Sequence, residues 1–230
     1  MTASLHRSIA IGTSIGFLML MALPTMADPL CASTAQRQTV RSAFNESPKS
    51  SPAKIASATG IPEAAVVHAM PMEARTAVSM LEFERVWQAL TEWEHALIIV
   101  PSSDSVFEIF GRLPKGEIDR GDFNFDGPDS AYGGQLKVDR LAAIYFLSTG
   151  GENGEIHQVA FYDLDGRRVF SVYVPRDDKG ALQTQPHSRF LRMKRDFGAL
   201  ATHSLLTDTS CLWGLNTDQN SIPLEERNEW

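Results

Sequence analysis

The stretch from Asp122 to Gly127 is the part of the sequence that most closely matches a metal-binding motif. It reads D-F-N-F-D-G, which fits the first half of an EF-hand loop, where alternating oxygen ligands face Ca²⁺ and glycine permits a sharp turn. The twelfth position of such a loop carries a bidentate glutamate, and this chain has Gly133 there. The pattern therefore favours a solvated acidic loop over a calcium site.

Histidines are the next candidates for metal binding or catalysis, but they are dispersed along the chain. None of those after residue 27 lies two to five positions from another, so the sequence encodes no local zinc motif. The motifs H-E-x-x-H, C-x-x-C, G-x-G-x-x-G and the Walker loop are absent, and G-x-S-x-G occurs only at 12–16, inside an apolar N-terminal run. We therefore predict that the protein is not an enzyme. The dispersed histidines are His68, His95, His157, His187 and His203.

The charge and aromatic content narrow the class of ligand. The chain has 230 residues and a formal net charge of −7, which argues against nucleic-acid binding because such proteins carry a basic surface. Twelve phenylalanines, four tryptophans and four tyrosines can line either a core or an apolar cleft. Composition alone does not distinguish these two uses.

Residues 1–27 have the three parts of a secretory signal peptide. Arg7 precedes an uncharged apolar run of about 15 residues, and Thr25 and Ala27 supply the small residues of a cleavage site. The run is shorter than the roughly 20 residues that span a bilayer, so no stable membrane insertion is expected after cleavage. The sequence thus predicts a secreted or periplasmic protein. The alternative is a cytoplasmic protein that starts at Met26.

The two cysteines are tied to this choice of compartment. Cys31 and Cys211 lie near opposite ends of the chain, and an oxidising compartment would permit a disulfide between them. In a reducing compartment both would be free thiols. The sequence leaves both alternatives open.

Helical signals come first along the chain. Residues 34–46 carry apolar positions at helical spacing, and Ser51 with Pro52 starts a short helix that Gly60 ends. A third helix follows Pro62. Residues 82–93 then place Phe83, Val86, Trp87 and Leu90 on one face, as expected for a helix packed on a sheet.

Strand signals follow from residue 95. Runs of β-branched and aromatic residues cover 95–100, 105–113, 135–147, 156–162 and 167–174, and Asp165-Gly166 is a strong hairpin signal. A last amphipathic helix covers about 178–197. Helices, then strands, then a helix indicate an α+β fold with an antiparallel sheet and helices on one side. The predicted division is a signal peptide at 1–27, a helical segment at 34–71, an α+β domain at 72–198 and an irregular tail at 199–230.

Several segments, in this order, resemble a known family. They are I-A-S-A-T-G-I-P-E-A-A-V-V at 55–67, V-F-E-I-F-G-R-L-P-K-G at 106–116 followed by G-D-F-N-F at 121–125, and the hairpin V-A-F-Y-D-L-D-G with V-F-S-V-Y-V-P-R-D within 159–177. Gln185 and Phe190 fit the closing helix. The chain is similar to the ChuX/HutX haem-utilisation proteins, small relatives of the HemS family.

The resemblance implies a curved antiparallel sheet with an N-terminal helical cap and a C-terminal helix packed on it. It also implies a homodimer that takes up haem and passes it on. Two histidines of the family fall on Pro101 and Gln135, so the iron ligation of the family does not carry over.

The resemblance still suggests candidate haem contacts. His157 or Tyr132 would replace the axial ligands, with His157 as the metal ligand. Gln135 would lie in the site, and Lys137 and Arg140 would meet the propionates. The predicted function is therefore an exported protein that binds or traffics haem or a related tetrapyrrole. The alternative is a non-enzymatic interaction or structural protein that kept the fold and lost haem ligation, with haem degradation a remote third.

Overall fold

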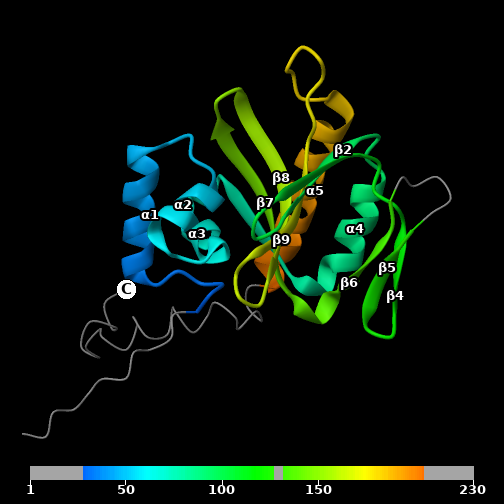
Figure 1. Cartoon of the computed structure of the whole chain (residues 1–230), viewed down its shortest axis with the longest axis horizontal. Coiled ribbons are helices and arrows are strands. Elements are labelled where there is room, and N and C mark those ends of the chain that lie inside the picture. Colours follow the sequence, from blue (N-terminus) through cyan, green and yellow to red (C-terminus); the bar gives the residue numbers. More distant parts are fainter. Residues whose placement is uncertain (1–27, 127–131, 205–230) are drawn as a thin grey trace, which may run out of the picture.

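A computed structural model of the chain describes residues 28–126 and 132–204 (Figure 1). Within these residues, a six-stranded antiparallel sheet and a separate three-stranded sheet are packed with five α-helices. The predicted α+β class, with a curved antiparallel sheet, an N-terminal helical cap and a C-terminal helix, is confirmed. No helix of the described residues is long and apolar enough to cross a membrane.

The three N-terminal helices form the cap, and their boundaries follow local signals. Helix α1 (Thr34–Glu46) begins with a capping box, in which Ser33 and Gln36 bond to each other's backbone N–H. Helix α2 (Pro52–Thr59) begins after Ser51 and ends at Gly60, whose φ of 71° suits glycine. Helix α3 (Glu63–Ala69) follows Pro62. All three were predicted from the sequence, because capping depends on neighbouring residues only.

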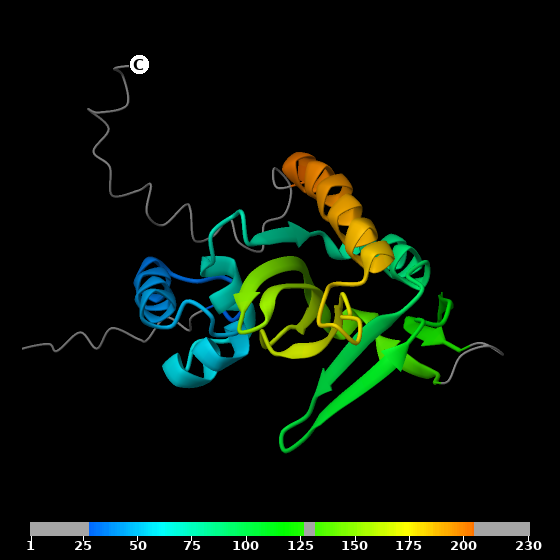
Figure 2. The ribbon, with the colours of Figure 1, turned by 90° about the horizontal axis from the view of Figure 1, so that it is seen from above.

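The large sheet has the strand order β1-β7-β8-β9-β2-β3, and all neighbouring strands are antiparallel. The β8–β9 turn is the predicted hairpin: Asp163 Oδ1 accepts from the N–H groups of Asp165 and Arg167. Figure 2 shows the curvature of the sheet and the β2–β3 hairpin projecting from it. The strands are β1 (Arg75–Val78), β7 (Leu141–Gly151), β8 (Gly154–Asp163), β9 (Arg168–Tyr173), β2 (Ala96–Pro101) and β3 (Val106–Gly111).

The small sheet corrects the prediction of one long strand at 135–147. A 3₁₀ turn, η2 (Val138–Arg140), interrupts this run, so β6 (Gly134–Lys137) joins the small sheet while β7 joins the large one. The other strands of the small sheet are β4 (Gly116–Asp119) and β5 (Asp122–Phe125). The EF-hand-like stretch therefore contains a strand, and the turn before it has Arg120 and Gly121 at positive φ. Strands β1, β4 and β5 were not predicted, and the solvated loop expected at 122–127 is wrong for residues 122–125.

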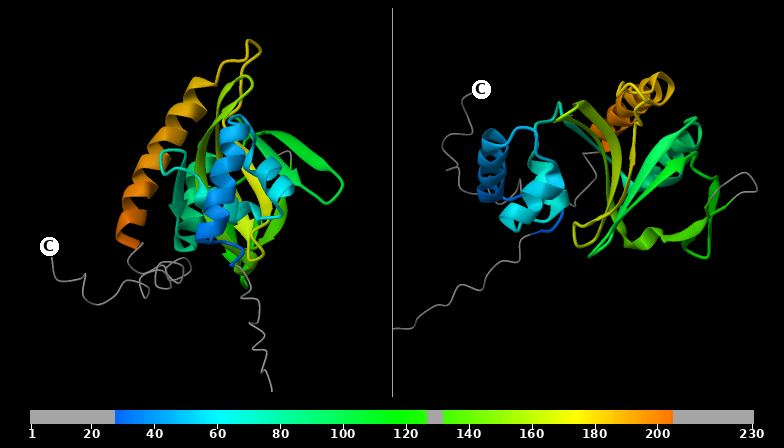
Figure 3. Two further views of the ribbon diagram at one scale, coloured as in Figure 1. Left: turned by 90° about the vertical axis from the view of Figure 1, so that its left-hand side faces the viewer. Right: turned by 45° about the horizontal axis from the view of Figure 1, so that its top comes forward.

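Side chains alternate between two covered faces of the large sheet. Phe146 and Phe161 belong to the main core, which also contains residues of α4 (Phe83–Thr91) and α5 (Thr184–Ser204). Tyr145 and Tyr162 point to the opposite face and pack with Val67 of α3. The cap and α5 thus lie on opposite sides of the sheet, as Figure 3 shows (right panel). The expectation that helices cover one side only is wrong, because strands β7 and β8 are apolar on both faces.

We expect Phe161→Ala to lower the free energy of unfolding by about 3–5 kcal/mol, because it opens a cavity in the core. The Phe161 side chain is fully buried, and its ring stacks on Phe170 with 4.3 Å between centroids. Urea unfolding monitored by tryptophan fluorescence measures the change. Leu81→Ala is the control, because the Leu81 side chain is 92% exposed and its loss should change stability by less than about 0.5 kcal/mol. Equal losses for both variants would contradict this assignment of the core.

Candidate functional site

On the face of the large sheet that carries the cap, no helix of the described residues covers a strip of largely apolar side chains. Leu97 of β2 pairs directly with Tyr173 of β9 and Phe110 of β3, and directly paired residues share a face. Ile99 lies two residues further along β2 on the same face. Phe110 is 58% exposed, and the other three side chains are half-buried. We call Leu97, Ile99, Phe110 and Tyr173 the open strip.

His95 extends the open strip at the start of β2. It lies two residues before Leu97, and its ring stacks on the Phe110 ring with 5.4 Å between centroids and 11° between planes. The imidazole is solvent-exposed. The sequence analysis did not identify the His95–Phe110 pair. The alternation of His95, Leu97 and Ile99 could have indicated His95, but only the β2–β3 register shows that Phe110 lies beside it.

Buried polar groups lie beside the strip on the same face. Gln158 pairs with Tyr173, and Ser171 pairs with Ile99. Both side chains are buried, and within the described residues neither Gln158 Oε1 nor Ser171 Oγ has a hydrogen-bond partner. Unpartnered buried polar atoms are costly and uncommon in folded proteins. This part of the sheet therefore combines apolar surface with unused hydrogen-bonding capacity.

An ion pair fixes the cap against one end of the strip. Arg168 Nη1 donates to the Tyr173 hydroxyl at 3.2 Å, and Arg168 Nε lies 3.6 Å from Glu63 Oε1 of α3. The Tyr162 hydroxyl donates to the same carboxylate at 3.2 Å. Burial raises the pKa of Glu63, and Arg168 partly offsets this. The network orients Tyr173 and joins α3 to β9.

Three of the sequence-derived site residues lie on or beside β6. Gln135 Nε2 donates to Asn124 Oδ1 at 3.0 Å, and Lys137 Nζ lies 3.3 Å from Asp122 Oδ1. Arg140 is exposed in η2. Gln135 and Lys137 thus share the polar face of the small sheet. In the described part of the chain, no group of three or more His, Cys, Asp or Glu side chains is arranged to hold a metal ion.

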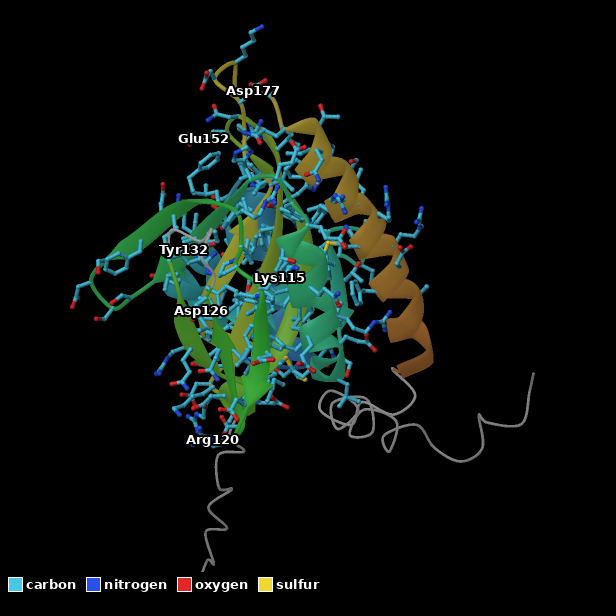
Figure 4. All side chains as sticks on the ribbon, turned by 90° about the vertical axis from the view of Figure 1, so that its right-hand side faces the viewer. Lys115, Arg120, Asp126, Tyr132, Glu152 and Asp177 are labelled. Carbon is cyan, nitrogen blue, oxygen red and sulfur yellow. The ribbon has the colours of Figure 1, made fainter. Side chains whose placement is uncertain are left out.

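Tyr132 and His157 lie in different environments. The Tyr132 hydroxyl donates to the Arg112 carbonyl at 3.2 Å, and burial raises its pKa to about 12, which disfavours the tyrosinate that would bind iron. His157 is 3% exposed and stacks on His187 of α5, with 4.7 Å between centroids. In Figure 4, Tyr132 is well separated from α5. The structure therefore does not bring His157 together with Tyr132.

The His157 side chain is part of a polar cluster between the sheet and α5. Its Nδ1 lies 3.0 Å from Ser148 Oγ, which also accepts from Lys194 Nζ at 3.0 Å. Its Nε2 lies 3.4 Å from Glu155 Oε2. Burial lowers the pKa of His157, and His187 and Lys194 add to this effect while Glu155 opposes it. The arrangement supports a neutral, structural imidazole.

A groove of about 390 Å³ lies between α4 and α5. Arg85 and Arg189 line it, but each forms an ion pair with a glutamate, Arg85 with Glu82 and Arg189 with Glu92. Arg85 also lies over the Phe197 ring at 5.6 Å. The two arginines are thus already neutralised by the protein.

Comparison with known proteins identifies the family of this chain. The profile of the family "Haem utilisation ChuX/HutX" matches residues 76–192, just over half of the chain. The chain belongs to this family. The predicted resemblance is thereby confirmed.

Individual relatives agree with this family. The intracellular heme transport protein HutX of Vibrio cholerae is 28% identical over 159 residues, which are 69% of this chain and 82% of HutX. The structure of the heme-binding protein ChuX has a TM-score of 0.62 and 20% identity, and covers 68% of this chain and 97% of ChuX. The heme-binding protein PhuS of Pseudomonas aeruginosa has a TM-score of 0.57 and 12% identity; the match covers 82% of this chain but 50% of PhuS. The similarities to ChuX and PhuS, at 20% and 12% identity, show a shared fold only.

The comparisons correct the expected location. HutX is described as intracellular, so the expectation of a secreted or periplasmic protein is wrong. Residues 1–27, on which it rested, lie outside the described residues. An apolar run shows only that a segment is hydrophobic, and signal peptides share this property with other kinds of segment. Cys31 is disulfide-bonded, and Cys211, for which the sequence left pairing with Cys31 open, lies outside the described residues.

We expect the free energy of unfolding to fall as the pH drops below about 6.5. The folded-state pKa of His157 is lowered, and burial lowers that of His68, whose Nδ1 accepts from Ala32 N–H, to about 4. The unfolded chain therefore binds more protons below about pH 6.5, so stability is full above this value and is lost toward pH 4.

Urea unfolding between about pH 7 and about pH 5 measures this effect above the range in which unperturbed carboxylates titrate. Glu63, whose pKa burial raises, is present in both proteins and cancels in the comparison below. The double variant His68→Asn/His157→Gln keeps hydrogen-bonding side chains but does not titrate there, so its stability should change less over this interval. An unchanged slope in the variant would show that other groups cause the pH dependence.

Proposed function

We propose that this protein is a non-enzymatic intracellular haem carrier that holds haem, or a related tetrapyrrole, on the open strip. The observation that carries the proposal is the partly exposed row Tyr173–Leu97–Phe110 in a member of a haem-utilisation family. HutX and ChuX are described as heme transport and heme-binding proteins, which supports a carrier rather than an enzyme.

The strip suits the chemistry of a porphyrin. The faces of a porphyrin are flat and apolar, and a sheet surface of leucine, isoleucine and aromatic side chains can cover one face while displacing water. Arg112, which is exposed two residues after Phe110, offers a cation for a propionate at the edge. Lys137 and Arg140 lie on and directly after β6 of the small sheet, where Lys137 is already paired with Asp122, so they are not part of the proposed propionate contacts.

The iron ligands of the family are not available at the same positions. Pro101 has no ligand atom, and the Gln135 amide is already bonded to Asn124. His157 could reach an iron only if α5 moved, because α5 covers its ring. Apolar contact with the strip must therefore supply most of the affinity in this proposal.

We expect hemin to bind the protein saturably, with a Soret band that differs from that of free hemin. Phe110→Gln should weaken binding about 10- to 100-fold, since it removes the contact of one large apolar side chain, worth about 1.5–3 kcal/mol. Titration followed by absorbance and by tryptophan quenching measures both. The matched control, Leu164→Gln, changes an exposed apolar side chain in the β8–β9 turn and should leave the affinity unchanged.

A protein that fails to bind hemin would contradict the proposal. It would favour the second candidate function, a non-enzymatic interaction protein that kept the fold and lost haem ligation. The replacement of both family histidines, by Pro101 and Gln135, is the observation that favours this candidate.

We further propose that the protein is a homodimer formed through β3. Strand β3 is the edge of the large sheet, and its side chains Val106, Phe107 and Phe110 are 58–59% exposed. Exposed apolar edge strands pair readily with another chain, and a two-fold axis lets the same edge serve both partners. The match to PhuS covers only half of that chain, so two copies of this fold correspond to its length.

We expect light scattering after size-exclusion chromatography to give twice the mass of one chain. Phe107→Lys should give a monomer, because it places a charge at the paired edge in both copies. Leu81→Lys makes the same kind of change at a side chain that is 92% exposed in the turn η1 (Met80–Glu82), and should stay dimeric. A wild-type monomer would overturn this part of the proposal.

A further inference from the structure

We propose that His95 is the axial ligand for the iron of a metalloporphyrin held on the open strip. The inference rests on the proposed function and specifies how that site binds iron. It assigns ligation to a position that differs from Pro101 and Gln135, where the family histidines fall.

The position of His95 directly before β2 supports this role. Its ring stacks on Phe110, which pairs with Leu97, so the imidazole lies on the side of the sheet that carries the open strip. Phe110 is the most exposed aromatic side chain of the open strip, and the two ring centroids are 5.4 Å apart. A porphyrin that covers Phe110 and Leu97 therefore lies next to this imidazole.

His95 is also available for coordination, unlike His68 and His157. His68 Nδ1 accepts a backbone N–H, and His157 is buried under His187 of α5. The ring nitrogens of His95 make no hydrogen bond within residues 28–126 and 132–204, and the imidazole is solvent-exposed. A metal ligand needs a free nitrogen lone pair that the metal can reach.

The stacked Phe110 ring has a second effect on the imidazole. Parallel packing at 11° restricts rotation of the His95 ring, so less conformational freedom is lost when iron binds. Ligation by one residue leaves the other face of the porphyrin without a ligand from the open strip. Such a site suits a carrier, because only one iron–protein bond must break when the cargo leaves.

The test compares hemin with protoporphyrin IX, which has the same ring but no iron. We expect His95→Ala to change the Soret band of bound hemin and to weaken hemin binding about tenfold, a loss of about 1.4 kcal/mol. Protoporphyrin IX binding, followed by its fluorescence, should not change. Added imidazole should restore the wild-type spectrum to the variant. His187→Ala is the matched control and should leave both ligands unaffected.

Each other outcome contradicts a definite part of the argument. A His95→Ala variant that binds hemin with the wild-type spectrum and affinity would overturn the ligand assignment while the carrier function stands. Equal weakening for hemin and protoporphyrin IX would show that His95 acts by packing alone. Wild-type protein that binds neither compound would remove the proposed function and this inference with it.

Discussion

The double-sided burial of β7 and β8 is the constraint on which the rest of the structure depends. Successive side chains point to opposite faces, so Phe146 and Phe161 enter the main core while Tyr145 and Tyr162 pack under the cap. A shift of one residue in the register would exchange these two sets. Because both sets are apolar or aromatic and both are covered, the helices must divide between the two faces.

The cap covers only part of its face, and this limit creates the candidate site. Its helices reach β7, β8 and the start of β9, where Arg168 meets Glu63. Beyond Tyr173 the same face continues onto β2 and β3, where no helix within residues 28–126 and 132–204 covers it, which leaves Phe110 exposed and Leu97 half-buried. The apolar character of these positions cannot be explained by the core, since the opposite face of β2 supplies the core residues.

Local signals predicted much of the fold but little of the site. The bounds of α1 and the β8–β9 turn follow from Ser33, Gln36 and Asp163, which bond within four residues of themselves. The run 135–147 was predicted as one strand because its hydrophobicity is continuous; only the different partners of β6 and β7 separate them. The role of His157 was unpredictable for the same reason, since α5 buries it from 30 residues away in sequence.

By itself, the sequence determined the class, the helical cap, the central hairpin and the resemblance to the ChuX/HutX family. These features depend on residue order, on 2- and 3.6-residue periods and on capping, all of which are readable along one chain. Only the tertiary structure decided which apolar residues stay exposed. The pairing of β2 with both β3 and β9 brings His95, Phe110 and Tyr173 to one surface, and such register is set by long-range contacts between strands that the linear pattern does not specify.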